Sequence, residues 1–169
     1  MDISEQRLRR VTENLARCGL TADLVAADVL DWRPDVAPDA ILLDAPCSAT
    51  GTIRRHPDLP FIRDGHGIAE LIELQATLLD HALSVLRPGG RLVYATCSLI
   101  PDEGEVQIDE VLVRHPGLIV ERPDLSRIDL PGIDPAWITE EGGLRLRPDY
   151  WADRGGMDGF YMACLRKPG

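Results

Sequence analysis

Five side chains that could take part in chemistry follow short apolar runs or lie just beyond them: Asp2, Asp28, Asp44, Cys47 and Cys97. A thiolate is a nucleophile, and a carboxylate accepts hydrogen bonds from hydroxyl and amino groups. Each residue also has an ordinary structural explanation, because an Asp after a strand often caps a helix and a free Cys often fills a core. If all five meet at one edge of the fold, a ligand-binding site is the better interpretation.

The elements around these residues would bring them to one edge. Apolar runs at residues 22–27, 40–43 and 91–95 are predicted strands, and each ends close to one of the polar or sulfur-bearing residues. Helices between the strands imply parallel pairing, and hence an α/β doubly wound sheet. Ligands of such sheets bind outside the carboxyl ends of the strands, which is where the five side chains would lie.

The predicted helices have recognisable boundaries. Ser4 is the expected N-cap of a helix over residues 5–18, and Gly19 is its expected stop. Residues 68–86 predict a long helix with apolar side chains nearly all round, as expected for a helix that packs on a sheet. A further helix is expected over residues 102–115.

The last fifty residues predict a loop region followed by two antiparallel edge strands, near residues 144–147 and 159–165. The segment Gly159-Phe160-Tyr161 is expected to close the edge of the sheet and not to stack against a base.

Length and charge limit the possible functions. The chain has 169 residues, a length typical of one domain, so we expect a single domain over residues 1–169. Hydrophobic residues make up 44% and charged residues 27%, which is ordinary for a globular protein and excludes wholesale disorder. The formal net charge is −10, whereas free-standing nucleic-acid binders are usually basic. An RNA or DNA partner would therefore need a positive surface from elsewhere.

The four cysteines, Cys18, Cys47, Cys97 and Cys164, lie far apart and form no Cys-x-x-Cys pair. This spacing argues against a zinc site, a redox dithiol or a disulfide scaffold, and it favours cytosolic thiols. The histidines show no metal-ligand spacing, so we expect no metal. No apolar run approaches the roughly 20 residues that span a bilayer, and no export signal is visible. We therefore expect a cytoplasmic protein without a membrane partner.

Two longer segments carry a family resemblance. Residues 44–58, which begin Asp-Ala-Pro-Cys-Ser-Ala-Thr-Gly, resemble the fourth motif of RNA cytosine-C5 methyltransferases, and residues 94–98, Tyr-Ala-Thr-Cys-Ser, resemble the sixth. The stretch from Asp2 to Phe160 is similar to the RsmB/Sun branch of that family, which comprises bacterial 16S ribosomal RNA methyltransferases. A lone Pro-Cys pair would be a weak signal, whereas two long motifs at this separation are specific.

The resemblance implies a Rossmann-like α/β sheet that uses S-adenosylmethionine as methyl donor. In the family, the catalytic domain begins with a strand and a Gly-rich loop that holds the methionine end of this cofactor, and no glycine occurs here before Gly19. We therefore expect the sheet to be incomplete at its N-terminal side, with the first strand and the Gly-rich loop missing. The N-terminal RNA-binding region of the family is expected only in a longer, full-length protein, which would account for the acidic charge.

The same resemblance implies that Cys97 is the nucleophile. Its thiolate would add to C6 of a cytosine in RNA and make C5 electron-rich enough to accept a methyl group. Cys47 would assist release of the methylated product. DNA cytosine methyltransferases instead use the Pro-Cys cysteine as nucleophile, and spacing within this sequence does not choose between the two. The match to the RNA family favours Cys97, with 16S ribosomal RNA as the expected substrate.

Residues for the cofactor and the RNA are also implied by resemblance. Asp2 would accept hydrogen bonds from ribose hydroxyls and Asp28 from the adenine amino group, while Asp44 would face the methionine ammonium group and the target base. Helix capping or loop anchoring is the alternative for all three carboxylates. Arg54 and Arg55 would hold RNA phosphates, and the alternative for them is a solvated charged loop.

Two other interpretations stay open. In one, the shortened chain is catalytically silent and acts only as a binding or assembly module, which the missing Gly-rich loop favours and the retained cysteine motifs oppose. In the other, the substrate is protein or DNA, which conflicts with the element Thr96-Cys97-Ser98 that such enzymes do not need. The sequence does not indicate which cytosine is modified or the oligomeric state.

Overall fold

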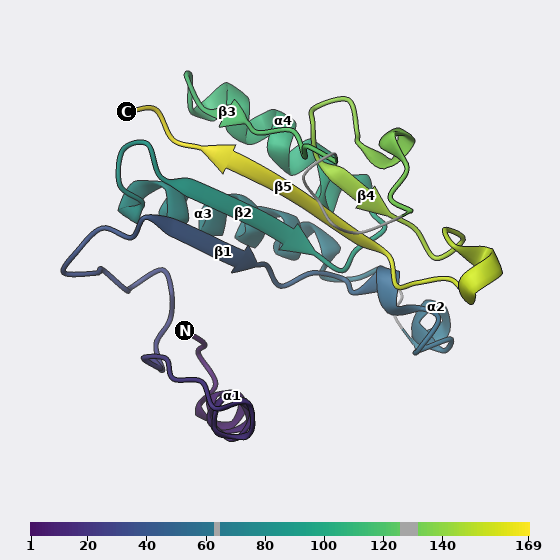
Figure 1. Cartoon of the computed structure of the whole chain (residues 1–169), viewed down its shortest axis with the longest axis horizontal. Helices are drawn as coiled ribbons and strands as arrows, with labels where there is room; N and C mark the ends of the chain where they lie inside the picture. Colours follow the sequence, from purple (N-terminus) through teal and green to yellow (C-terminus); the bar gives the residue numbers. More distant parts are fainter. Residues whose placement is uncertain (63–64, 126–131) are drawn as a thin grey trace. The chain divides into compact units, whose positions relative to one another are not determined.

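The computed structural model describes residues 1–62, 65–125 and 132–169 (Figure 1). These residues form two compact units, Met1–Val36 and Ala37–Gly169. A single domain over residues 1–169 therefore stays a prediction.

The first unit is built on helix α1, Glu5–Cys18, with the predicted boundaries. The hydroxyl of Ser4 accepts a hydrogen bond from the Arg7 backbone N–H, which satisfies one of the free donors at the start of the helix. Gly19 adopts the left-handed conformation (φ 66°) and its N–H bonds to the carbonyl oxygen of Ala16. Both predicted capping residues are therefore confirmed.

The strand predicted over residues 22–27 is wrong. Only one isolated parallel bridge forms there, between Asp2 and Ala26. Two backbone hydrogen bonds hold it, from the N–H of Asp2 to the oxygen of Val25 and from the N–H of Ala27 to the oxygen of Asp2. The segment is half-buried or exposed throughout. A strand needs a ladder of backbone partners, and an apolar run alone does not supply one.

The second unit contains a five-stranded mixed sheet in the order β1-β2-β5-β3, with β4 also paired to β5. Strand β1, Ala40–Asp44, pairs in parallel with β2, Arg91–Thr96. Strand β5, Phe160–Arg166, runs antiparallel to β2. The far side of β5 pairs with the short strands β3, Ile119–Val120, and β4, Leu144–Leu146. The parallel pair β1–β2 confirms the predicted connection of these two strands through a helix.

Strand β5 corrects a second prediction. Residues 144–147 and 159–165 were expected to form two edge strands, and β4 and β5 do pair antiparallel with each other. However, β5 lies inside the sheet, because β2 occupies one side of it and β3 and β4 the other (Figure 1). Strand β3 was not predicted, since two residues are too few to produce a periodic pattern.

Helix α3, Ile68–Val85, and helix α4, Glu105–Arg114, are the long helices of this unit. The helix expected over residues 102–115 is divided into the 3-10 turn η2, Pro101–Glu103, and α4, with Gly104 between them. The remaining helical pieces are short: α2 (Leu59–Ile62), η1 (Thr50–Thr52), η3 (Pro135–Trp137) and η4 (Ala152–Arg154). No helix within the described ranges has the length and apolar character that crossing a membrane requires.

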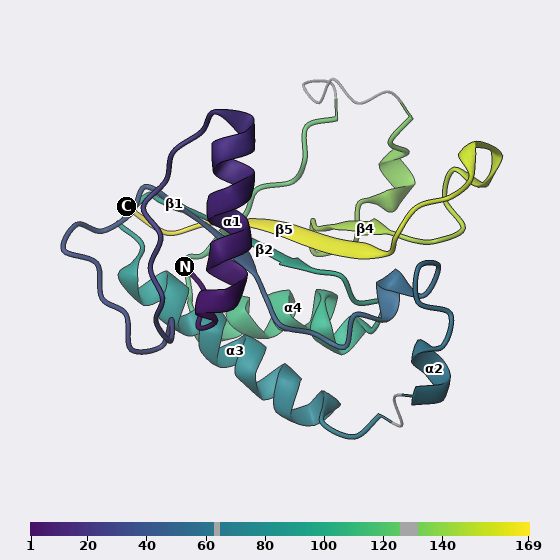
Figure 2. The ribbon, with the colours of Figure 1, turned by 90° about the horizontal axis from the view of Figure 1, so that it is seen from below.

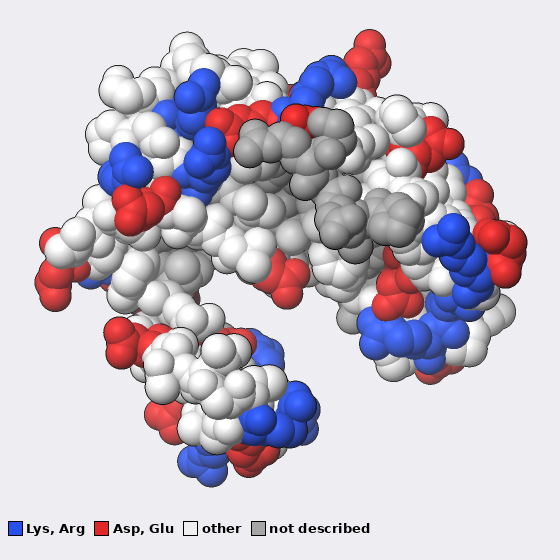
Figure 3. Space-filling model, viewed as in Figure 1, with Lys and Arg blue, Asp and Glu red and all other residues white. Residues whose placement is uncertain are grey.

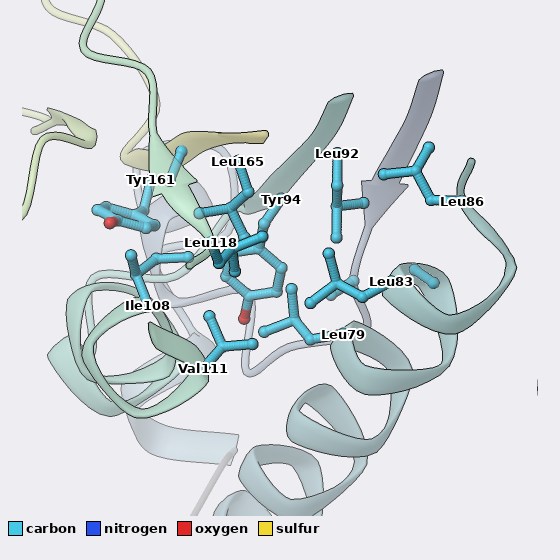
Figure 4. Packing of buried hydrophobic residues seen from close by; sticks show 13 residues of the cluster. Leu79, Leu83, Leu86, Leu92, Tyr94, Ile108, Val111, Leu118, Tyr161 and Leu165 are labelled. Atoms are coloured by element: carbon cyan, nitrogen blue, oxygen red, sulfur yellow. The ribbon is translucent and has the colours of Figure 1, made fainter. Parts of the chain in front are cut away.

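The hydrophobic core of this unit lies between the sheet and helices α3 and α4 (Figure 4). Leu79 and Leu83 from α3, with Ile108 and Val111 from α4, pack against side chains from β2 and β5. These strand residues are completely or almost completely buried: Leu92, Tyr94, Tyr161, Ala163 and Leu165. Burial of apolar surface stabilises the folded state by about 25 cal/mol per Å². Because residues of β1 and β2 belong to this core, it holds the two strands in place.

Both long helices cover the same face of the sheet (Figure 2). On β1, Ile41 and Leu43 point to the core, whereas Leu42 between them is 72% exposed. This alternation is the period of two expected for a strand. Within this unit, therefore, the described residues supply one helical layer of the two that a doubly wound sheet implies.

Candidate functional site

The sulfur atoms of Cys47 and Cys97 lie 3.5 Å apart. The adjacent parallel strands β1 and β2 bring them together, because Asp44 at the end of β1 is in register with Ala95 near the end of β2. Cys97 directly follows β2, and Cys47 lies three residues beyond β1. Both side chains are half-buried. The predicted meeting of the two thiols at the carboxyl edge of the sheet is confirmed.

The two thiols have opposite tendencies to ionise. Their mutual hydrogen bond is the main cause of both shifts, lowering the pKa of Cys97 to about 7 and raising that of Cys47 far above its ordinary range. Burial and the charge of Glu103 raise the pKa of Cys47 further. Around Cys97, Asp44 opposes ionisation and Arg55 favours it. When one thiol of the pair ionises, these opposite shifts favour Cys97 as the thiolate and Cys47 as its hydrogen-bond donor.

A hydrogen-bonded network lies beneath the thiols. The carboxylate of Glu103 accepts the backbone N–H and the hydroxyl of Ser48, and the hydroxyl of Ser98. The hydroxyl of Thr50 lies 3.2 Å from both serine hydroxyls and accepts the N–H of Leu99 at 2.9 Å. The segments after the two cysteines are therefore bonded to each other and to a shared carboxylate.

Sequence reasoning did not identify Glu103 as part of this site. It precedes α4, and acidic residues are common near the start of any helix because they interact favourably with the helix dipole. Its burial would have been the informative signal, and burial of a single carboxylate is not visible in a sequence.

Asp44 lies at the same edge as the thiols, at the last position of β1, and its side chain is exposed. Its charge acts on the thiol of Cys97. The structure therefore brings together three of the five predicted residues, Asp44, Cys47 and Cys97.

Asp2 and Asp28 belong to the first unit, where each makes local hydrogen bonds. Asp2 accepts bonds from the side chain of Arg7 and from the N–H of Ser4, which lower its pKa to about 2. The carboxylate of Asp28 accepts the N–H of Leu30, two residues on. These contacts are the capping and loop-anchoring roles considered above, and a role in binding a cofactor stays a prediction for both residues.

The arginines expected to bind RNA are exposed. The guanidinium of Arg55 donates to Asp158 at 2.7 Å. Arg54 lies close to Gly156, since a Cβ atom there would be 3.2 Å from its guanidinium carbon. Figure 3 shows Lys and Arg interspersed with Asp and Glu over the face it views. Positive charge is therefore accompanied by negative charge on this face.

A pocket of about 180 Å³ begins at the segment that follows Cys47. Its walls come from that segment, from α2 and from the start of α3, and they are mainly apolar. The lining residues are Ser48, Thr50, Ile53, Leu59, Pro60, Gly65, His66, Ile68 and Leu71.

Two further predictions concern histidines and the end of the sheet. His115 bonds to Asp80 at 2.8 Å, and in the described part of the chain no three His, Cys, Asp or Glu side chains gather as a metal site would require. Tyr161 is completely buried, and its hydroxyl donates to Glu141. It belongs to the sheet and its core, so it has no face free for a base.

Comparison with known proteins identifies the family. Residues 1–166 match the family described as 16S rRNA methyltransferase RsmB/F. Ribosomal RNA small subunit methyltransferase B of Salmonella paratyphi B is 51% identical over 170 residues, which cover 99% of this chain and 36% of that protein. The chain spans about a third of the length of the curated relatives it matches.

Solved structures agree with this match. A methyltransferase homologue from Pyrococcus horikoshii aligns with a TM-score of 0.74 and 33% identity, covering 98% of this chain and 52% of that one. NSun6 from Pyrococcus horikoshii, solved with SFG, aligns with a TM-score of 0.77 and 30% identity, covering 98% of this chain and 40% of that one. The fold is part of a Rossmann-like methyltransferase fold, as the sequence predicted. The chain belongs to the 16S rRNA methyltransferase RsmB/F family.

Proposed function

We propose that this chain is part of an S-adenosylmethionine-dependent enzyme that methylates C5 of a cytosine in RNA, with 16S ribosomal RNA as substrate. Cys97 is the nucleophile and Cys47 assists product release. The observation that carries the proposal is the thiol pair: two sulfur atoms 3.5 Å apart with opposite shifts in pKa. Family membership supports the rRNA substrate.

The arrangement of the thiols suits covalent catalysis. The thiolate of Cys97 forms a bond to C6 of cytosine, and the electron pair of the C5–C6 double bond makes C5 nucleophilic. S-adenosylmethionine, when bound, supplies the methyl group to C5. Water then takes the proton on C5, the electrons of that C–H bond re-form the C5–C6 double bond, and the C6–S bond breaks with its electron pair returning to Cys97. In this proposal the S–H group of Cys47, whose sulfur lies 3.5 Å from that of Cys97, donates a hydrogen bond to the sulfur that leaves.

We propose, from the family resemblance, that Asp2, Asp28 and Asp44 each hold a polar group of S-adenosylmethionine. A carboxylate has about four lone-pair sites, and three hydrogen bonds from Ser4 and Arg7 engage Asp2. Asp28 and Asp44 are exposed. We assign the ribose hydroxyls to Asp2, the adenine amino group to Asp28, and the methionine ammonium group to Asp44. These acceptors suit the ligand, because its hydroxyl and amino groups all donate hydrogen bonds.

Transfer of a labelled methyl group tests the function. We would measure transfer from tritiated S-adenosylmethionine to a 16S rRNA transcript, using this chain joined to the segments of the Salmonella paratyphi B relative that it does not cover. Cys97→Ala is expected to abolish transfer. Cys47→Ala is expected to accumulate a covalent protein–RNA adduct that is visible as a shifted band on a denaturing gel. Cys164→Ala, which changes a half-buried thiol on β5, is the matched control and should keep activity.

Several outcomes would reject the proposal. If the adduct accumulates in Cys97→Ala and transfer is lost in Cys47→Ala, the two roles are exchanged. If the label appears in 5-methyluridine, in DNA or in protein, the substrate class is wrong. If the joined protein transfers no methyl group at all, the chain has a role other than catalysis.

A further inference from the structure

The carboxylate of Glu103 is completely buried beneath the thiol pair. Its Oε1 atom accepts the backbone N–H of Ser48 at 2.8 Å and the side-chain amide of Gln75 at 3.0 Å. Its Oε2 atom accepts the hydroxyls of Ser48 and Ser98, each at 2.5 Å. Four donors thus meet an acceptor-only group, and a buried carboxylate is tolerated in a protein when it is hydrogen-bonded in this way.

These donors connect the carboxylate to both cysteines through the chain. Ser48 directly follows Cys47, and Ser98 directly follows Cys97. Gln75 also donates to the carbonyl oxygen of the residue before Cys47, at 2.8 Å. The loops that carry the two sulfur atoms are therefore both bonded to the carboxylate of Glu103. The hydrogen bonds to this carboxylate determine how far apart the two loops lie.

The backbone of Glu103 is held as firmly as its side chain. Its carbonyl oxygen accepts the phenol of Tyr94 at 2.9 Å and the hydroxyl of Thr96 at 3.2 Å, both from β2. Tyr94 and Thr96 are completely buried. The carboxylate is thus fixed relative to the strand that ends at Cys97.

Neighbouring charges affect the pKa values of the two thiols differently. The negative charge of Glu103 acts on Cys47. Asp44 and Arg55 act on Cys97 with opposite signs, so their effects partly cancel. Negative charge close to a thiol opposes formation of a thiolate, and the buried position of Glu103 limits screening by water and salt. Burial is the main cause of the raised pKa of Tyr94, and the charge of Glu103 contributes to it.

We propose that Glu103 is the positioning residue of the thiol pair: its buried carboxylate, bonded to the residues that follow both cysteines, sets the contact between Cys47 and Cys97 and places a negative charge next to the Cys47 loop. The inference rests on the proposed function, because a nucleophilic thiolate beside a thiol donor is what the covalent mechanism needs. Glu103 itself touches neither sulfur atom through a hydrogen bond described here, so it acts through Ser48 and Ser98 and through its charge.

The first test measures thiol reactivity in this chain without RNA. Each cysteine is alkylated by iodoacetamide to low conversion between pH 5 and 10, and labelling is quantified by peptide mass spectrometry. In Glu103→Gln, which keeps the shape and removes the charge, the pH midpoint of Cys47 is expected to fall. The labelling ratio of Cys47 to Cys97 at pH 8 is expected to rise about threefold, the change that about half a pKa unit produces, because the charge of Glu103 is the smallest contribution to the raised pKa of Cys47.

Glu121→Gln is the matched control. Glu121 is likewise a carboxylate beside a thiol: burial is the main cause of the raised pKa of Cys164, and the charge of Glu121 and its contact with the thiol raise that pKa further. This variant should change the labelling of Cys164 and leave the ratio of Cys47 to Cys97 as in the wild type. An unchanged ratio in Glu103→Gln, with circular dichroism as in the wild type, would overturn the charge effect.

Ser98→Ala tests whether the hydrogen bonds of Glu103 position the two thiols. It also provides a test if the Glu103→Gln variant does not fold. It removes one donor to Oε2 while the charge remains. The rate at which diamide joins Cys47 to Cys97 is expected to fall at least about threefold, while the order in which the two thiols ionise is retained. An unchanged rate would overturn the positioning role.

The two proposals can fail separately. If the joined protein described above transfers methyl groups but Glu103→Gln leaves both its pH–rate profile and its thiol labelling unchanged, the positioning role is rejected and the function stands. If Glu103→Gln changes the labelling as expected but the joined protein is inactive, the proposed function is rejected and the positioning of the thiols stands.

Discussion

The backbone N–H of Gly51 donates to the carbonyl oxygen of Cys97 at 2.9 Å, so the segments that follow β1 and β2 are in direct backbone contact. The N–H of Gly159, before β5, donates in turn to the carbonyl oxygen of Gly51 at 2.8 Å. A Cβ atom on Gly51 would lie 2.1 Å from the oxygen of Gly159 and 2.8 Å from that of Cys97. Only a residue without a side chain fits between these backbones.

Gly51→Ala should therefore destabilise the protein and disturb the thiols. We expect the free energy of unfolding to fall by about 1–3 kcal/mol, the usual cost of overpacking, and the diamide cross-link between Cys47 and Cys97 to form more slowly. Urea unfolding followed by circular dichroism gives the first quantity. Gly169→Ala, where a Cβ atom meets nothing within 4 Å, is the control and should change neither. A stable Gly51→Ala variant with normal cross-linking would contradict the close approach.

The alkylation of Cys97 should depend on pH with a midpoint near 7. Its lowered pKa means that the reactive thiolate is present above pH 7 and is lost as the pH falls below it. In Cys47→Ala the donor to this thiolate is removed, so the midpoint should move upward. Initial alkylation rates, resolved by peptide, measure both. A wild-type midpoint near 9 would show that the hydrogen bond between the thiols does not favour the thiolate of Cys97.

Mild oxidation should join Cys47 to Cys97 selectively. Diamide takes two electrons and two protons from a pair of thiols, and sulfur atoms 3.5 Å apart need to approach to about 2.05 Å to bond. We expect one disulfide in a non-reduced digest, with Cys18 and Cys164 recovered as alkylated thiols. The same treatment in urea is the control and should give mixed pairings. Mixed pairings in the native protein would contradict the observed contact.

Arg145→Met should cost far more stability than Arg147→Met. Arg145 is buried, pairs with both oxygens of Glu105, donates to the carbonyl oxygen of Ser98 and lies over the ring of Tyr161. Removing it leaves a partly buried carboxylate unpaired, so we expect a loss of about 3 kcal/mol. Arg147, two residues further along the chain, pairs with Asp149 on the surface, and its replacement should cost at most about 1 kcal/mol. Equal losses in urea unfolding would show that the buried pair is not important for stability.

Arg54→Ala and Arg55→Ala should each weaken RNA binding by the joined protein and reduce the slope of log affinity against log salt by about 1. The effect of Arg55 should be the smaller, because binding a phosphate competes with its ion pair to Asp158. Filter binding at several salt concentrations measures both. Arg114→Ala, on α4 and paired with Asp80, is the control. A slope unchanged in both variants would assign these arginines to a solvated loop.

The parts of the fold that sequence reasoning predicted correctly are those with local causes. Ser4 and Gly19 define α1 through hydrogen bonds within three or four residues. The position of β5 depends instead on β2, whose partner residues lie about seventy positions earlier, and no short pattern encodes such pairing. The run at residues 22–27 has the composition of a buried strand but only a single bridge. Composition shows that a segment is able to form a strand, whereas the strand forms only if a partner segment supplies backbone hydrogen bonds.

The residues of the candidate site likewise differ in whether their role can be recognised from the sequence. Cys47 and Cys97 could be found because thiols at the ends of successive parallel strands meet at one edge. Glu103 could not, because its importance lies in donors from three other segments that converge on it. Gly51 was read as part of a motif, whereas its contact with the backbone of Gly159 depends on a strand more than a hundred residues later.

The central place of β5 has a consequence for synthesis on the ribosome. In the described part of the chain, every antiparallel ladder of the sheet includes residues 160–166, so a nascent chain has β1 and β2 long before either β3 or β4 can pair. Until then, the free edge of β2 offers unpaired backbone groups to any neighbouring strand. Folding of this unit is therefore expected to finish only after Arg166 has left the exit tunnel, and translation that stops before Phe160 should release an aggregation-prone product.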